Sequence, residues 1–281
     1  MITMPGLAAD ALAGFLADYM ARRFASWEGR LVEAVPAAAR LALEYIGNSD
    51  ALYHNVEHTM LVALAGHDIM RGRALQTHMS VSDYAHFMIA CLTHDIGYVR
   101  GLLVGDDEEG FVVDSLGAKA KLSRGASDAA LMPFHVDRSE LFVLERFKNL
   151  ELLDAARIAR AVEGSRFPAS VPTESVESNE EADLLRAADL IGQLGDPQYI
   201  RKANALYYEF EEIGLNRQLG YDNPADLIHK YPQFYWNSVA DHVQTAIRYL
   251  NVTTSGREWI ANLHANVFRA ERAIRLSGPQ H

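Results

Sequence analysis

The sequence predicts an all-α fold. Apolar residues recur at helical spacing along most of the 281 residues. No alternating strand pattern of useful length stands out, and there is no internal repeat or low-complexity tract. Because 49% of the residues are hydrophobic and 22% are charged, the chain can bury one large core. We therefore predict a single all-α domain over residues 1–281.

The apolar stripes place the individual helices in chain order. Two helices occupy the first 50 residues, and GNSDALY at 47–53 ends the second stripe. A capping box opens two of the later helices, Ser80-x-x-Asp83 and Ser178-x-x-Glu181. Residues 97–110 are rich in Gly and Asp and predict a loop. The other predicted helices run from about His54 to Met70, from 81 to 94, over 109–122 and 126–132 (both short), and over 138–163, 182–190, 197–213, 236–250 and 256–274.

The charge balance limits the partners. Asp and Glu outnumber Lys and Arg by 37 to 26, which gives a net charge of -11. Most of the surface would therefore repel a polyanionic backbone, and no nucleic-acid polymer is expected as a partner. A small phosphorylated substrate remains compatible, because a bound divalent ion reverses the local potential of an acidic pocket.

Cysteine usage and the N-terminus favour a cytoplasmic protein. Cys91 is the single cysteine, so no intrachain disulfide can form, and its apolar neighbours predict a buried, unreactive thiol. The N-terminal segment carries Asp10 and Asp18 and lacks the basic start and cleavage site of a signal peptide. No apolar run reaches the ~18 residues of a membrane span, so no membrane partner is expected. A homo-oligomer stays open.

Two histidines four residues apart are the densest chemical feature. They are His54 and His58 in the segment YHNVEH, and at this spacing they share one face of a helix. That arrangement suits two groups that act at one site. A pair of exposed or capping histidines at a helix start is the alternative. Tyr53 and Asn55 are expected to fix the local backbone, and Glu57 is expected at the surface.

A histidine and an aspartate follow at the end of a strongly apolar helix. His94 and Asp95 both suit borderline or hard divalent ions, and adjacent helical positions approach an ion from different sides. A buried histidine bonded to the aspartate is the alternative. His67-Asp68 is a second such pair, but His67 lies nine residues after His58 and so on the opposite helix face. We interpret it as unrelated to the site.

A further carboxylate sits among small and apolar residues. It is Asp189 in RAADLIG, and a buried aspartate needs a metal or another partner. An ion pair with Arg186, three residues earlier, is the alternative.

In this order, His58, His94-Asp95 and Asp189 match the H…HD…D signature of the HD superfamily of metal phosphohydrolases. YHNVEH at 53–58 resembles the YHN-x-x-H motif of class I cyclic-nucleotide phosphodiesterases. AADLIGQLGDP resembles the stretch around their last metal-binding aspartate. The resemblance implies an HD-domain helical bundle with a metal-binding core at about 50–195 and helical extensions at 1–49 and 196–281.

The resemblance also implies roles. His58, His94, Asp95 and Asp189 would ligate one divalent ion (Mn, Fe, Mg, Zn or Ni), and Asp95 would bridge to a second. His54 would be the general acid that protonates the leaving oxygen. The implied reaction is attack of metal-bound hydroxide on a phosphomonoester or phosphodiester of a small molecule, a nucleotide or cyclic nucleotide.

One departure concerns the second ion. The phosphodiesterases continue as HD-x-x-H-P-G, with a histidine near that ion. Here the segment continues Ile96-Gly97-Tyr98-Val99-Arg100, with Tyr98 in the place of the histidine. One metal site is therefore expected, and a second stays open.

Four further residues are candidates for contacting the substrate. Arg100 follows the HD segment and could bind a phosphate, with a solvated loop arginine as the alternative. His135 and Arg138 bring an imidazole and a guanidinium together after a proline, with helix capping as the alternative. Arg166 is a candidate of the same kind.

Two other functions stay open. An HD-fold di-iron oxygenase would need more histidine ligands, for which His135 and His86 are the nearby candidates. A metal-stabilised binding or regulatory protein that has lost catalysis would not need an acid beside the ligands. The presence of His54 argues against this second alternative.

Overall fold

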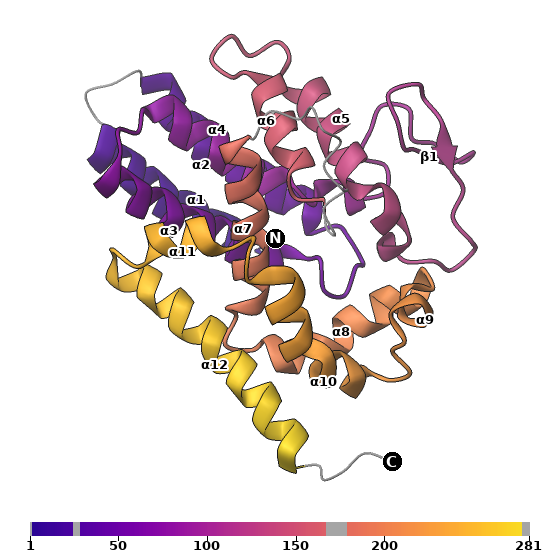
Figure 1. The fold of residues 1–281 in the computed structure, drawn as a ribbon. Coiled ribbons are helices and arrows are strands. Elements are labelled where there is room, and N and C mark those ends of the chain that lie inside the picture. The colour runs from indigo at the N-terminus through magenta and orange to yellow at the C-terminus, as the bar shows by residue number, and fades with distance from the viewer. Residues whose placement is uncertain (1, 25–28, 167–178, 277–281) are drawn as a thin grey trace.

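The computed structural model describes residues 2–24, 29–166 and 179–276, and helices form most of this part of the chain. The all-α prediction is confirmed. The first two helices, α1 (Met4–Phe24) and α2 (Gly29–Ile46), pack side by side against α3 (Val56–Gln76) and α4 (Val81–Thr93), as Figure 1 shows.

Small residues let the central helices approach one another closely. A Cβ on Gly192 of α7 (Glu180–Leu194) would lie 2.8 Å from the backbone nitrogen of Val62 in α3. A Cβ on Gly66 of α3 would lie 2.7 Å from Sγ of Cys91 in α4. Both distances are shorter than van der Waals contact, so only glycine fits at these crossings. The three helices that carry the predicted metal ligands are thereby held together.

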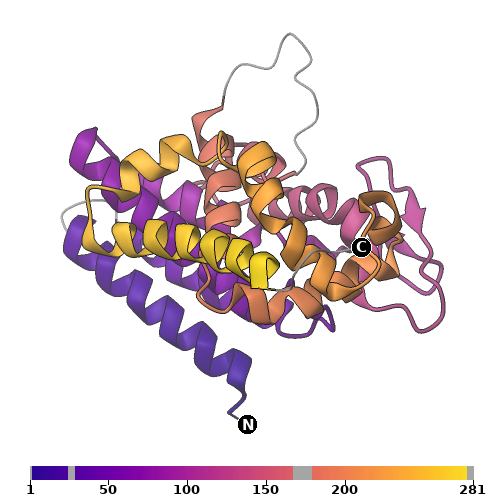
Figure 2. The same ribbon diagram turned by 60° about the horizontal axis from the view of Figure 1, so that its bottom comes forward.

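The C-terminal part covers α3 and α7 from one side (Figure 2). The predicted helices at 197–213 and 256–274 correspond to α8 and α12. The predicted helix at 236–250 is interrupted, because a π-helical turn precedes α11, and α10 was not predicted. The elements are α8 (Tyr199–Glu212), α9 (Leu215–Leu219), α10 (Pro224–Phe234), the π-helical turn η3 (Tyr235–Val239), α11 (Gln244–Leu250) and α12 (Thr254–Leu276).

The middle of the chain departs from the prediction in two places. Residues 109–122 form an antiparallel hairpin of β1 (Phe111–Val112) and β2 (Lys119–Ala120). Gly110 and Gly117 take positive φ there, a conformation that turns favour over helices. The predicted helix at 138–163 is two helices, α5 (His135–Phe147) and α6 (Ala155–Glu163), because Asp154 caps a new N-terminus.

The short helices near the site are of the 3₁₀ type. The predicted helix at 126–132 is confirmed as η2 (Asp128–Phe134). A single turn, η1 (Ile96–Tyr98), follows the HD pair within the predicted loop.

The capping residues define where the site helices begin. The capping box of Ser80 and Asp83 is confirmed. Asn55 caps α3 by accepting from the backbone of Glu57 and His58, so the helix begins at Val56 and not at His54 as predicted. Ser178 lies outside the described residues, and Asn179 is the N-cap of α7.

One contiguous apolar cluster extends from Ala9 in α1 to Ala270 in α12. Cys91 is fully buried in it, as predicted. Among the described helices, none combines the length and the apolar character needed to cross a bilayer.

Candidate metal centre

The four predicted ligands converge at one point. Nε2 of His58, from α3, lies 3.1 Å from Oδ2 of Asp95 and 3.3 Å from Oδ1 of Asp189 on α7. Nε2 of His94, at the end of α4, lies 3.1 Å and 3.7 Å from the same two oxygens. The two imidazoles and Asp95 are buried, and the side chain of Asp189 is 21% exposed. The centre therefore opens to solvent on the Asp189 side.

Three of these four separations fit ligand atoms of one divalent ion, and the fourth, 3.7 Å between His94 and Asp189, is slightly longer. An ion about 2.1 Å from each ligand atom places neighbouring ligand atoms about 3.0 to 3.4 Å apart. Nε2 of His58, Nε2 of His94 and Oδ2 of Asp95 are buried and have no hydrogen-bond partner within the described residues. Such groups are costly to bury unless something else satisfies them, and imidazole with carboxylate is a common donor set for transition metals.

Hydrogen bonds and charges prepare the ligands. Nδ1 of His94 donates to the carbonyl of Cys91 at 2.9 Å, which leaves the lone pair on Nε2 facing the centre. Burial by itself raises the pKa of Asp95, but the imidazoles of His94 and His58 outweigh it and hold that pKa well below its usual range. Asp95 is therefore ionised, as a ligand must be.

A glutamate that the sequence analysis missed orients His54. Oε2 of Glu209, in α8, lies 2.5 Å from Nδ1 of His54, and Oε1 accepts from the backbone nitrogens of Tyr53 (2.6 Å) and His54 (3.2 Å). Glu209 is 1% exposed, and although burial raises its pKa, His54 lowers it more. His54 in turn has a ring nitrogen within 4.8 Å of ligand atoms of His58 and Asp95.

Tyr98 lies between two histidines beside the centre. Its ring stacks on His54 at 4.6 Å with an interplanar angle of 12°, and on His135 at 4.6 Å and 24°. Nδ1 of His135 donates to the carbonyl of Met132 at 2.5 Å, and its Nε2 lies 3.6 Å from Oδ1 of Asp95. The structure thus brings His135 to the centre with a free lone pair on Nε2.

Gly97 permits this approach. A Cβ on Gly97 would lie 1.9 Å from the carbonyl oxygen of His135. The backbone nitrogen of Gly97 also donates to Oγ of Ser139 at 2.9 Å. The segment after the HD pair therefore packs directly on the start of α5.

Arg138 does not face a substrate. Its guanidinium is fully buried and forms an ion pair with Asp106 at 2.9 Å. It also donates to the carbonyls of Gly97 (2.7 Å), Val99 (2.8 Å) and Val112 (2.5 Å). The prediction of a substrate contact is wrong, because this side chain ties the loop after the HD pair to α5.

Arg100 is also committed to structure. Its guanidinium bonds Asp128, Asp50 (2.7 Å) and the carbonyl of Ala126 (3.2 Å), so each of its three nitrogens already donates. It closes the loop that leads to η2, which corrects its assignment as a phosphate ligand. Arg166 is likewise bonded, to Asp137 and Glu163.

His67 and His86 have partners away from the centre. Nδ1 of His67 lies 2.7 Å from the hydroxyl of Tyr84, and neither His67 nor Asp68 belongs to the ligand groups. Nδ1 of His86 donates to the carbonyl of Ser82 at 2.7 Å, and its Nε2 accepts from the backbone of Asp154 at 2.8 Å. His86 therefore has no nitrogen left for a second metal.

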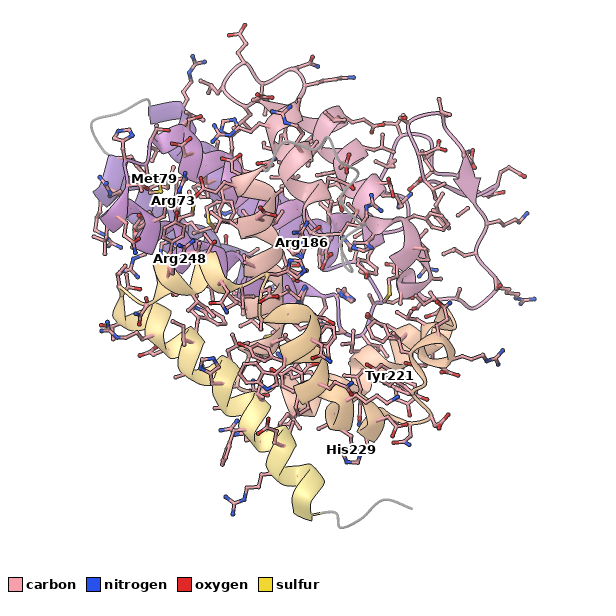
Figure 3. All side chains as sticks on the ribbon, in the orientation of Figure 1. Arg73, Met79, Arg186, Tyr221, His229 and Arg248 are labelled. Carbon is pink, nitrogen blue, oxygen red and sulfur yellow. The ribbon has the colours of Figure 1, made fainter. Side chains whose placement is uncertain are left out.

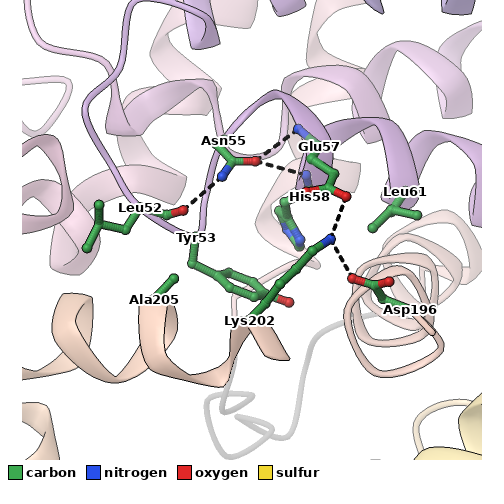
Figure 4. Close-up of a pocket in the computed structure, with 9 residues that line it drawn as sticks. All are labelled: Leu52, Tyr53, Asn55, Glu57, His58, Leu61, Asp196, Lys202 and Ala205. Atoms are coloured by element: carbon green, nitrogen blue, oxygen red, sulfur yellow. Dashed lines mark hydrogen bonds and ion pairs between the residues drawn. The ribbon is translucent and has the colours of Figure 1, made fainter. Parts of the chain in front are cut away.

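A small cavity of about 100 Å³ lies beside His58 (Figure 4). At its edge, Nζ of Lys202 joins Glu57 at 2.7 Å and Asp196 at 2.6 Å. Pockets for drug-sized ligands have volumes of roughly 300 to 1,000 Å³, so this cavity is too small for a nucleotide. The ion pair of Lys202 with Glu57 joins α8 to the first turn of α3.

Comparisons with known proteins place the chain in a family without describing an activity. A family model described as Npun_R2479-like matches residues 5–273, which is nearly the whole chain. No curated protein and no solved structure gives a significant match.

Proposed function

The chain belongs to the Npun_R2479-like family, and we propose that it is a metal-dependent phosphohydrolase of HD type that acts in the cytoplasm. Its substrate would be a small phosphomonoester or phosphodiester, such as a nucleotide or cyclic nucleotide. One observation carries the proposal: four ligand side chains converge beside an imidazole that a buried carboxylate holds in place.

The four ligands are His58, His94, Asp95 and Asp189. A divalent ion held there would supply a Lewis acid that activates water near neutral pH and offsets the charge on the phosphoryl oxygens. The side chain of Asp189 is 21% exposed, so a substrate would approach the centre from its side. The acidic protein surface favours small phosphorylated molecules over nucleic acids.

His54 holds the proton for the leaving oxygen. Its Nδ1–H donates to the buried carboxylate of Glu209, which fixes the orientation of the ring. The other ring nitrogen, Nε2, can then carry a proton toward the departing group. Glu209 is thus a positioning residue that fixes the orientation of His54.

Asp95 offers its second oxygen to a second ion. Oδ2 faces His58 and His94, whereas Oδ1 faces Nε2 of His135 at 3.6 Å. That separation is slightly longer than the roughly 3.0 to 3.4 Å expected for two ligand atoms of one ion, so a bound ion would draw the two side chains together. We include in the proposal a second ion, which Asp95 and His135 would hold. It would bind more weakly than the first, because Tyr98 stands where the phosphodiesterases have a histidine.

Elemental analysis of the purified protein, followed by a hydrolysis screen, tests the proposal. Bis-p-nitrophenyl phosphate and a panel of nucleotides serve as substrates, each with Mn²⁺, Mg²⁺, Ni²⁺ or Fe²⁺. Asp95→Ala should lose the metal and activity together. His54→Ala should keep the metal and lose turnover, and His78→Ala, which changes an exposed histidine, should keep both.

Two results would contradict the proposed function, and a third would change the role of His54. Bound iron with oxygen consumption and no phosphate release would indicate the oxygenase, even though His86 is engaged elsewhere. Bound metal without hydrolysis of any substrate would indicate a binding or regulatory protein. Loss of metal from His54→Ala would make His54 a ligand and not the acid.

A further inference from the structure

One face of α7 carries a second polar residue beside the metal ligand. Arg186 precedes Asp189 by three residues, so the two side chains leave the helix about 60° apart and about 4.5 Å apart along its axis. Figure 3 labels Arg186 on α7, in the middle of the molecule. An arginine side chain at this position is long enough to turn from Asp183 toward a molecule bound at the solvent-facing side of Asp189.

Arg186 has unused hydrogen-bond donors. Its side chain is 16% exposed, and its Nη1 donates to Asp183 at 3.1 Å. Its Nε is buried and has no partner within the described residues. Glu163 is close enough to feel its charge, but that carboxylate is bonded to Arg166. A buried N–H without an acceptor is unfavourable, so the side chain would gain a hydrogen bond by turning its Nε toward an incoming anion.

The ion pair with Asp183 is easily exchanged. The Asp183 side chain is 59% exposed and lies three residues before Arg186 on the same helix. Solvent and salt screen such pairs, so they contribute little to stability. The other arginines near the centre differ, because Arg100 and Arg138 bond carboxylates that are nearly fully buried.

We propose that Arg186 binds the phosphoryl group of the substrate while the metal centre holds the reacting oxygen. The guanidinium fork matches two oxygens of a phosphate, and the positive charge compensates for the acidic surroundings. This inference rests on the proposed function. It makes Arg186 a binding residue, separate from the ligands and from His54.

Binding of inorganic phosphate to the Mn²⁺-loaded full chain tests the proposal. Calorimetry gives the Kd of Mn²⁺ first and the Kd of phosphate second. Arg186→Gln should weaken phosphate binding about tenfold or more, as expected for hydrogen bonds to a charged group. The Kd of this variant for Mn²⁺ should stay within about threefold of the wild-type value, because the four metal ligands are unchanged. Arg186→Lys keeps the charge and loses the planar fork of the guanidinium. It should bind phosphate more weakly than wild type but more tightly than Arg186→Gln.

Asp183→Asn is the matched control. It removes the competing carboxylate and should tighten phosphate binding, the opposite of the change expected for Arg186→Gln. With bis-p-nitrophenyl phosphate, Arg186→Gln should raise KM more than it lowers kcat.

Unchanged phosphate affinity in Arg186→Gln, with Mn²⁺ still bound, would overturn the role of Arg186 and leave the metal centre intact. Weaker phosphate binding in Asp183→Asn would overturn it as well. If the wild-type chain bound no Mn²⁺ or other divalent ion, the proposed function and this inference would both fail.

Discussion

Replacing Gly97 by alanine tests how the segment after the HD pair is held against α5. The added Cβ would lie 1.9 Å from the carbonyl oxygen of His135 and 2.8 Å from the backbone nitrogen of Ser139. Ordinary contact begins at 3.4 Å, so the start of α5 must move by roughly 1.5 Å. The obstructing atoms are backbone, and no rotamer change can relieve the clash.

The cost follows from what the movement breaks. Overpacking a core costs about 1–3 kcal/mol by itself. The displacement would also stretch two buried hydrogen bonds of Gly97, to Ser139 (2.9 Å) and from Arg138 (2.7 Å), each worth about 1–3 kcal/mol if left unmade. We expect a loss of about 3–6 kcal/mol, a large share of a typical stability of about 5–15 kcal/mol.

Urea denaturation measures this loss as a fall in the free energy of unfolding. Gly14→Ala is the matched control, because a Cβ there meets nothing within 4 Å in an exposed turn of α1. It should raise stability by about 0.5–1 kcal/mol, since alanine favours helix. Stability of Gly97→Ala within about 1 kcal/mol of wild type would refute the contact between this segment and α5.

Three further predictions concern other parts of the site and its frame. Glu209→Gln should lower kcat about 10- to 100-fold while the metal content stays the same, because His54 loses a charged acceptor; an unchanged kcat would show that this acceptor is dispensable. Arg138→Met leaves the carboxylate of Asp106 buried and unpaired, and should cost about 3–5 kcal/mol in urea denaturation. A cost under about 1 kcal/mol would contradict the structural role of Arg138. Burial raises the pKa of Asp83, but its ion pair with Arg157 outweighs this and lowers it from 3.8 to about 2. Because the pKa of Asp83 is lower in the folded than in the unfolded chain, the ion pair stabilises the fold fully above about pH 4. This stabilisation is lost as the pH falls toward 2. The side chain is partly exposed, so the contribution is about 1 kcal/mol. In Asp83→Asn the decline in stability between these pH values should be shallower than in wild type.

The convergence of the four candidate ligands could be predicted because each sits in a short motif that fixes its local geometry. His58 and Asp189 lie 131 residues apart, yet the order of the motifs grouped them correctly. Helix positions followed from apolar periodicity, which reports directly on the buried face. The hairpin at 109–122 could not be predicted in this way. Its apolar stretches are too short for their spacing to distinguish a strand from a helix.

Partners that lie far apart in the chain explain the remaining misses. Glu209 has no local sequence signal, and its role appears only when α8 packs 155 residues away on His54. Arg138 resembles a substrate ligand in its local sequence, whereas its acceptor, Asp106, comes from a loop 32 residues earlier. A charge shows its partner only after folding, so a local pattern cannot distinguish a buried ion pair from a binding residue.

The position of Glu209 divides the centre between two stretches of polypeptide. A fragment that ended near residue 195 would retain all four ligand side chains, but the imidazole of His54 would lose the only carboxylate that bonds it within the described residues. Under the proposed function, metal binding depends on residues up to Asp189, whereas proton transfer also depends on α8. Under the same proposal, the last third of the chain is therefore part of the site and not only a cover over α3 and α7.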